Sequence, residues 1–158
     1  MARSHYIQPT APTESSITVR LGASAAAYTQ KEEGKIVKLA AESQYNLAVA
    51  GDEIEGIVTS VESATQNQFT IAGVAVEFER ATVVFDGLQA TPGIGVVAIG
   101  DYVVAGTITA AGTALTSYPK VCKATGAGTT LNHKFRVVSL GTAGTGAVGT
   151  TGVIQRVC

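Results

Sequence analysis

Residues 48–61 read AVAGDEIEGIVTSV and residues 97–110 read VAIGDYVVAGTITA, so one phrase occurs twice in this chain. In each copy a Gly-Asp pair separates an apolar run from a second run of Ile, Val and Thr. Glycine tolerates the positive φ of a tight reversal, and aspartate hydrogen-bonds to backbone close by in the sequence. We therefore expect two β-hairpins that these pairs close. The structural turn residues are Gly51, Asp52, Gly100 and Asp101.

Short strand-like runs continue on both sides of the repeated phrase. Residues 16–21 alternate apolar and polar side chains, and residues 74–80 place alternate apolar side chains on one face. Turn signals recur about every ten residues, which is the spacing of a sandwich or barrel rather than of βαβ units. We expect an all-β fold, a single-domain β-sandwich or barrel over residues 17–158.

The first 16 residues, MARSHYIQPTAPTESS, differ from the rest of the chain. They are polar and contain Pro9 and Pro12, neither of which fits a central strand. We expect residues 1–16 to form an extended N-terminal arm. Two alternatives stay open for it: a frayed terminus, or a segment that becomes ordered on a partner with Tyr6 and Ile7 as its anchors.

Two further stretches depart from the strand pattern. Residues 23–33 predict one or two helical turns, with Thr29 and Glu32 at capping-box spacing and Gly34 as the stop. Residues 141–152, GTAGTGAVGTTG, are low in complexity and predict a mobile loop, because they have little apolar surface to bury.

The composition is poor in charge. Charged residues make up 15% of the 158 residues and apolar residues 46%, whereas an average globular domain is about 25% charged. A surface with so few charges favours contact with a partner protein. The net charge of −1 predicts no nucleic-acid partner, and no apolar run is long enough to predict a membrane span. The N-terminus lacks the apolar segment of a secretory signal, which predicts assembly in the cytoplasm.

We find no pattern that predicts catalysis, a cofactor or a metal. Asp52 and Asp101 occupy equivalent positions of the repeat and could face each other as a carboxylate dyad. A role in capping the two turns explains their positions better. His5 and His133 have no second ligand at metal-ligand spacing in the sequence. Cys122 is one of only two cysteines, and we expect both to be reduced thiols rather than a disulfide. The second cysteine is Cys158.

Four segments taken in order resemble the small head decoration, or cement, proteins of tailed bacteriophages. These segments are GKIVKLA (34–40), AGDEIEGIVTSVE (50–62), ATVVFDGLQ (81–89) and VVAIGDYVVAGTITAAGTAL (96–115). The resemblance covers roughly residues 34–125 and is a pattern of glycines, aspartates and apolar strands. It transfers no individual site residue to this chain.

The resemblance implies a jelly-roll-like or barrel protein that binds the outside of a phage head and stabilises the lattice of major capsid proteins. It also implies a homo-oligomer, a dimer or trimer, located on the capsid surface of the virion. The composition of the arm leads us to expect capsid contacts through Tyr6, Ile7 and Ile17. The alternative is another β module of the virion, a tail or fibre component with a receptor-binding role. The discriminating observation is the number of copies per particle.

Overall fold

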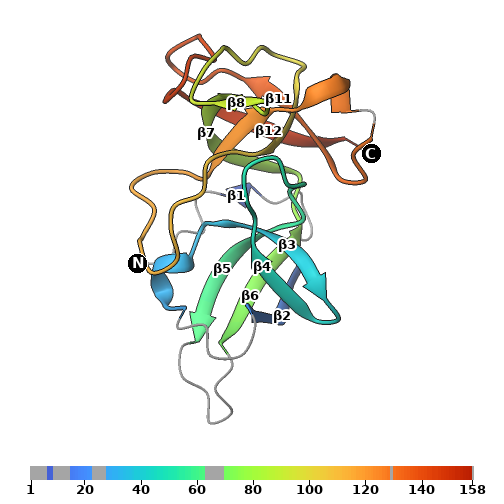
Figure 1. Cartoon of the computed structure of the whole chain (residues 1–158), viewed down its shortest axis with the longest axis vertical. Helices are drawn as coiled ribbons and strands as arrows, with labels where there is room; N and C mark the ends of the chain where they lie inside the picture. Colours follow the sequence, from blue (N-terminus) through green and yellow to red (C-terminus); the bar gives the residue numbers. More distant parts are fainter. Residues whose placement is uncertain (1–6, 9–14, 23–27, 63–69, 129, 158) are drawn as a thin grey trace.

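A computed structural model describes residues 7–8, 15–22, 28–62, 70–128 and 130–157. The strands form two sheets, and both sheets close into small barrels (Figure 1). The helices in these ranges are the 3-10 turns η2 (Gln30–Glu32) and η3 (Thr125–Gly128), so none is long and apolar enough to cross a membrane. The prediction of an all-β fold is confirmed, whereas the jelly-roll order is not.

The first barrel has five strands and appears in blue to green in Figure 1. It closes in the order β2-β4-β3-β5-β6, with β6 pairing back to β2. Its strands are β2 (Ser15–Leu21), β3 (Ile36–Ala41), β4 (Gln44–Leu47), β5 (Gly56–Glu62) and β6 (Ile71–Glu77).

The second barrel lies above the first in Figure 1 and closes in the order β7-β10-β9-β11-β12, with β12 pairing back to β7. Two short strands pair with β7 at its ends: β1 (Ile7–Gln8) at the start and β8 (Thr91–Pro92) at the finish. The barrel strands are β7 (Arg80–Leu88), β9 (Tyr102–Ala105), β10 (Lys120–Lys123), β11 (Lys134–Ser139) and β12 (Thr151–Val157).

The two barrels have the same connectivity. When the five strands of each are numbered in chain order, both barrels run 1-3-2-4-5 and return to 1. In both, the pairing of strands 1 and 3 is parallel and every other pairing around the barrel is antiparallel. Closure removes the free edges on which open sheets aggregate.

One apolar core continues from the first barrel into the second. A single cluster of buried side chains joins Ile36, Ile57 and Ala75 of the first barrel to Phe85 and Ile154 of the second. Alternate residues in a strand point to opposite faces, so the residues next to Ile36, Ile57 and Ala75 in the chain point into the interior of the first barrel. These neighbours are Val37, Val58 and Val74. At these positions β3, β5 and β6 are therefore buried on both faces.

The expectation of two hairpins was wrong. β4 and β5 flank the pair Gly51-Asp52, but both pair with β3 and not with each other. Before Gly100 the expected strand is reduced to an isolated bridge at Val96. The chain does reverse at each Gly-Asp pair. However, the backbone groups of each turn form hydrogen bonds with a strand elsewhere in the chain, so the two segments that flank the turn do not pair with each other.

The arm and the helical turn are seen only in part. Ile7 pairs with Ala81 through β1, and Ser15 already belongs to β2, while most of residues 1–16 lie outside the described residues. Residues 23–27 of the expected helix lie outside the described residues. The described part, residues 28–33, forms the single turn η2, in which the Thr29 hydroxyl accepts a 3.3 Å hydrogen bond from the Lys31 N–H.

The glycine-rich segment 141–152 packs against the second barrel. The N–H of Val97 donates a 3.0 Å hydrogen bond to the carbonyl of Gly146. A Cβ on Gly146 would lie 1.7 Å from the Val97 carbonyl oxygen, so only glycine permits this approach. The segment's glycines therefore allow close backbone packing, where we expected a mobile loop.

A buried ion pair joins the barrels at η2. The Glu32 side chain is 0% exposed and pairs with the Lys35 ammonium. The remaining bonds of both groups go to the 107–119 segment of the second barrel, which runs down beside η2 in Figure 1. The Lys35 ammonium donates a 2.9 Å bond to the carbonyl of Ala110, and the N–H of Gly112 donates to the Glu32 carboxylate. Each charged group thus has a partner of opposite charge and a hydrogen bond to the backbone.

We predict that Glu32→Gln lowers the free energy of unfolding by about 3–5 kcal/mol, because it leaves the Lys35 ammonium buried and unpaired. Urea unfolding of the full chain measures the change. The double variant Glu32→Gln/Lys35→Met removes both charges and should recover most of the loss. A single variant within about 1 kcal/mol of the original chain would contradict this role for the pair.

Candidate interaction surface

The two Gly-Asp pairs form turns of the same geometry. Gly51 has a φ of 93° and Gly100 a φ of 90°. The carboxylate of Asp52 accepts a 2.8 Å hydrogen bond from the Val49 N–H. In the second copy, the carboxylate of Asp101 accepts a 2.8 Å bond from the N–H of the residue three positions earlier, Ala98. Each aspartate therefore caps its own turn.

Each turn also docks on a strand elsewhere in the chain. The N–H of Gly51 donates to the Ala105 carbonyl at 2.8 Å, and the Ala105 N–H donates to the Asp52 carbonyl at 2.9 Å. The second turn repeats this exchange with Val137 of β11, at 2.8 and 2.9 Å. Because Ala105 belongs to β9, the first turn links the two barrels.

The second carboxylate oxygen of each aspartate pairs with a lysine. The ammonium of Lys38 lies 2.7 Å from Asp52 Oδ1, and that of Lys123 lies 2.9 Å from Asp101 Oδ1. The hydrogen bond and charge of Asp52 raise the pKa of the Lys38 ammonium above its usual value. Both carboxylates are therefore engaged by a turn N–H and a lysine.

Four exposed apolar side chains lie on two neighbouring segments of the second barrel. Ile94, Val96 and Ile99 are 66%, 60% and 65% exposed, and Val148 is 42% exposed. We call these four residues the apolar loop patch. The 94–99 segment lies at the end of the second barrel away from the first (Figure 1). Exposed apolar side chains on neighbouring segments make this end of the second barrel a candidate interaction surface.

The segments that carry the apolar loop patch are held in place by backbone contacts. Val96 forms an antiparallel bridge with Ala147, next to Val148. The N–H of Leu88 donates a 2.9 Å bond to the carbonyl of Ile94. A partner that binds a surface anchored in this way loses less conformational entropy than one that must order a free loop.

The residues that we expected to contact a capsid lie elsewhere. Tyr6 is outside the described residues, and Ile7 lies in β1, whose side chains are not described. Ile17 is 38% exposed on β2 of the first barrel. We expected the apolar run before Gly100 to be one strand of a hairpin, so the exposure of Val96 and Ile99 was not predicted. The available signal was a run of apolar residues enclosed by Pro92-Gly93 and Gly100-Asp101.

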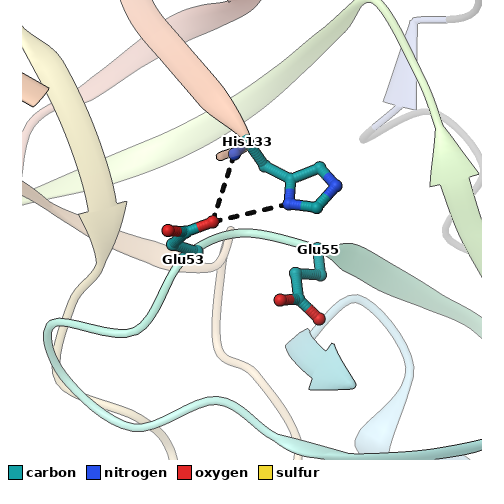
Figure 2. A group of neighbouring side chains, drawn as sticks. All are labelled: Glu53, Glu55 and His133. Atoms are coloured by element: carbon teal, nitrogen blue, oxygen red, sulfur yellow. Dashed lines mark hydrogen bonds and ion pairs between the residues drawn. The ribbon is translucent and has the colours of Figure 1, made fainter. Parts of the chain in front are cut away.

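A polar cluster at the barrel junction brings together Glu53, Glu55 and His133 (Figure 2). The Glu53 carboxylate accepts hydrogen bonds of 3.1 Å from the backbone N–H groups of Asn132 and His133. Burial would raise the pKa of the Glu53 carboxyl, but these bonds and the His133 side chain outweigh it and lower the pKa below its usual value. Sequence spacing placed no carboxylate beside His133, but the fold brings two there.

One other candidate group, the Cys122 thiol, is buried in the described structure. Cys122 is a free thiol with 0% exposure, and its Sγ lies 3.5 Å from the Asp86 carbonyl oxygen. Burial and the charge of Asp86 raise the pKa of this thiol to about 11, so it is not a nucleophile at neutral pH. Cys158 lies outside the described residues.

A cavity of about 20 Å³ between Lys35 and Ile108 has room for about one water molecule.

No family model, no curated protein and no solved structure matches this chain. The sites above are therefore interpreted from their own geometry.

We predict that Asp101→Ala lowers the free energy of unfolding by about 1–2 kcal/mol, because the Ala98 N–H loses its acceptor. Asp101→Asn keeps a side-chain oxygen for that N–H and loses only the exposed ion pair with Lys123, so it should cost less than about 1 kcal/mol. Guanidinium unfolding measures both. Equal losses in the two variants would contradict the capping role.

Proposed function

We propose that this chain is a capsid decoration, or cement, protein that binds the outside of a phage head and stabilises the lattice of major capsid proteins. It acts without a catalytic group or cofactor. Its place is the capsid surface of the virion, after assembly in the host cytoplasm. The observation that carries the proposal is the apolar loop patch, presented by a body in which two barrels share one core.

The chemistry of the apolar loop patch fits adhesion to another protein. Fully burying one Ile or Val side chain contributes about 1.5–3 kcal/mol, so even part of the patch supplies useful affinity. A homo-oligomer, a dimer or trimer, would repeat the patch around a symmetry axis. Simultaneous contacts with several shell subunits then multiply modest affinities through effective concentration.

The resemblance stated above supports the same role. It rests on the order of the glycines, aspartates and apolar strands over roughly residues 34–125. The alternative function is a tail or fibre component with a receptor-binding role, which the same apolar surface would also serve. The two functions differ in copy number, because a shell is decorated at many equivalent positions and a tail at few.

We predict that particles purified from infected cells contain this chain in nearly the abundance of the major capsid protein. Quantitative mass spectrometry of the particles measures the ratio, and an electron-microscopy map of the same particles locates the density. A copy number comparable to that of tail proteins would favour the alternative. Absence of the chain from purified particles would overturn both functions.

We predict that Ile94→Asp and Ile99→Asp each reduce the occupancy of the protein on particles at least several-fold, because a buried carboxylate in the contact is costly. Both positions are exposed, so the free energy of unfolding should change by less than about 0.5 kcal/mol. Ala41→Asp, at an exposed position of the first barrel, is the matched control and should bind normally. Unchanged occupancy of both patch variants would remove the apolar loop patch from the contact.

The same binding assay separates the patch from the arm. Removing residues 1–12 deletes Tyr6 and Ile7, and Ile17→Asp alters the third expected contact. Reduced occupancy of these variants would add the arm to the interface. Unchanged occupancy would refute our expectation for Tyr6, Ile7 and Ile17 and leave the apolar loop patch as the contact.

A further inference from the structure

Glu53, Glu55 and His133 bring metal-binding side chains from both barrels to one point (Figure 2). The two glutamates lie in the extended segment before β5, and Ile54 between them is buried in the core. Alternation along the chain therefore turns both carboxylates away from the core, to the same side. His133 directly precedes β11 of the second barrel. One ligand atom from each residue lies within 4.8 Å of the others.

The His133 Nδ1 atom is buried, although the side chain as a whole is 40% exposed, and it makes no well-directed hydrogen bond within the described chain. It lies 3.4 Å from Glu53 Oε2, which Figure 2 marks as an ion pair. Zinc bonds of about 2.0–2.2 Å in a tetrahedral site place neighbouring ligand atoms roughly 3.3–3.6 Å apart. The Nδ1 and Oε2 atoms already have this separation.

Backbone groups hold both carboxylates in position. Glu53 is fixed by the N–H groups of Asn132 and His133, and Glu55 accepts a hydrogen bond from the Leu39 N–H. Outer hydrogen bonds of this kind orient metal ligands and limit the entropy that is lost on binding. An ionised carboxylate has about four acceptor positions, so both groups keep lone pairs for an ion.

We propose that Glu53, Glu55 and His133 form a binding site for a divalent transition-metal ion, with Zn²⁺ as the best fit, at the junction of the two barrels. Imidazole nitrogen with carboxylate oxygen suits Zn²⁺, whereas Mg²⁺ and Ca²⁺ prefer oxygen ligands alone. Three protein ligands leave a position for water. Because the ligands come from both barrels, the ion binds the folded chain in preference to the unfolded one and stabilises it.

The test uses the full chain with His5→Gln, stripped of metal with EDTA. The chain has two histidines, so this variant leaves His133 as its only imidazole. On addition of ZnCl₂, we expect calorimetry to find one ion per chain, the melting temperature to rise by a few degrees, and the His133 ring resonances to shift in NMR spectra. The same concentration of MgCl₂ should produce none of these changes.

A pair of matched variants separates this site from other zinc-binding groups. Glu55→Gln keeps an oxygen for the Leu39 N–H, so the metal-free protein should melt normally, but its affinity for Zn²⁺ should fall about ten-fold or more. Glu62→Gln, at an exposed position of β5, should keep the original affinity. Equal affinities in the two variants, or unshifted His133 resonances with Zn²⁺ in excess, would overturn the proposal. This site is independent of the capsid role, so either proposal can fail alone.

Discussion

Apolar packing across the junction of the two barrels is the constraint on which the rest of the structure depends. Five short strands enclose a small core, and a unit of about 60 residues is marginally stable alone. Here the outward-facing side chains Ile36, Ile57 and Ala75 of β3, β5 and β6 are buried as well and join the core of the second barrel. The stacked rings of Phe78 and Phe135, with centroids 4.9 Å apart, lie where the chain passes from one barrel to the other.

Polar contacts at the junction fix the orientation of one barrel relative to the other. The Glu32–Lys35 pair bonds to the 107–119 segment, the Glu53 carboxylate bonds to the loop before β11, and the Gly51 turn bonds to β9. Apolar surfaces alone can slide, whereas hydrogen bonds to fixed backbone groups hold one orientation. A partner that binds the second barrel therefore meets a surface whose position relative to the first barrel is also constrained.

The repetition in the sequence and the repetition in the fold do not coincide. Gly51-Asp52 lies between the third and fourth strands of its barrel, and Gly100-Asp101 lies between the first and second strands of its own. Both turns nevertheless use the same capping bond, the same exchange with a distant strand and the same lysine pair. The repeated phrase thus encodes a docking turn rather than a strand order. The low charge of the chain also has a second explanation, because strands buried on both faces need apolar residues on both.

The all-β class and the two reversals were determined by the sequence alone, because glycine conformation, aspartate capping and period-two alternation are local properties. Period-two alternation over residues 16–21 also located a strand, because β2 (Ser15–Leu21) buries one face. Only the tertiary structure decided that β4 and β5 share β3 as a neighbour, since pairing partners are chosen by packing between distant segments. It likewise placed His133 beside Glu53, 80 residues earlier, and exposed Ile94 and Ile99, because no local pattern records which surfaces of a barrel remain uncovered.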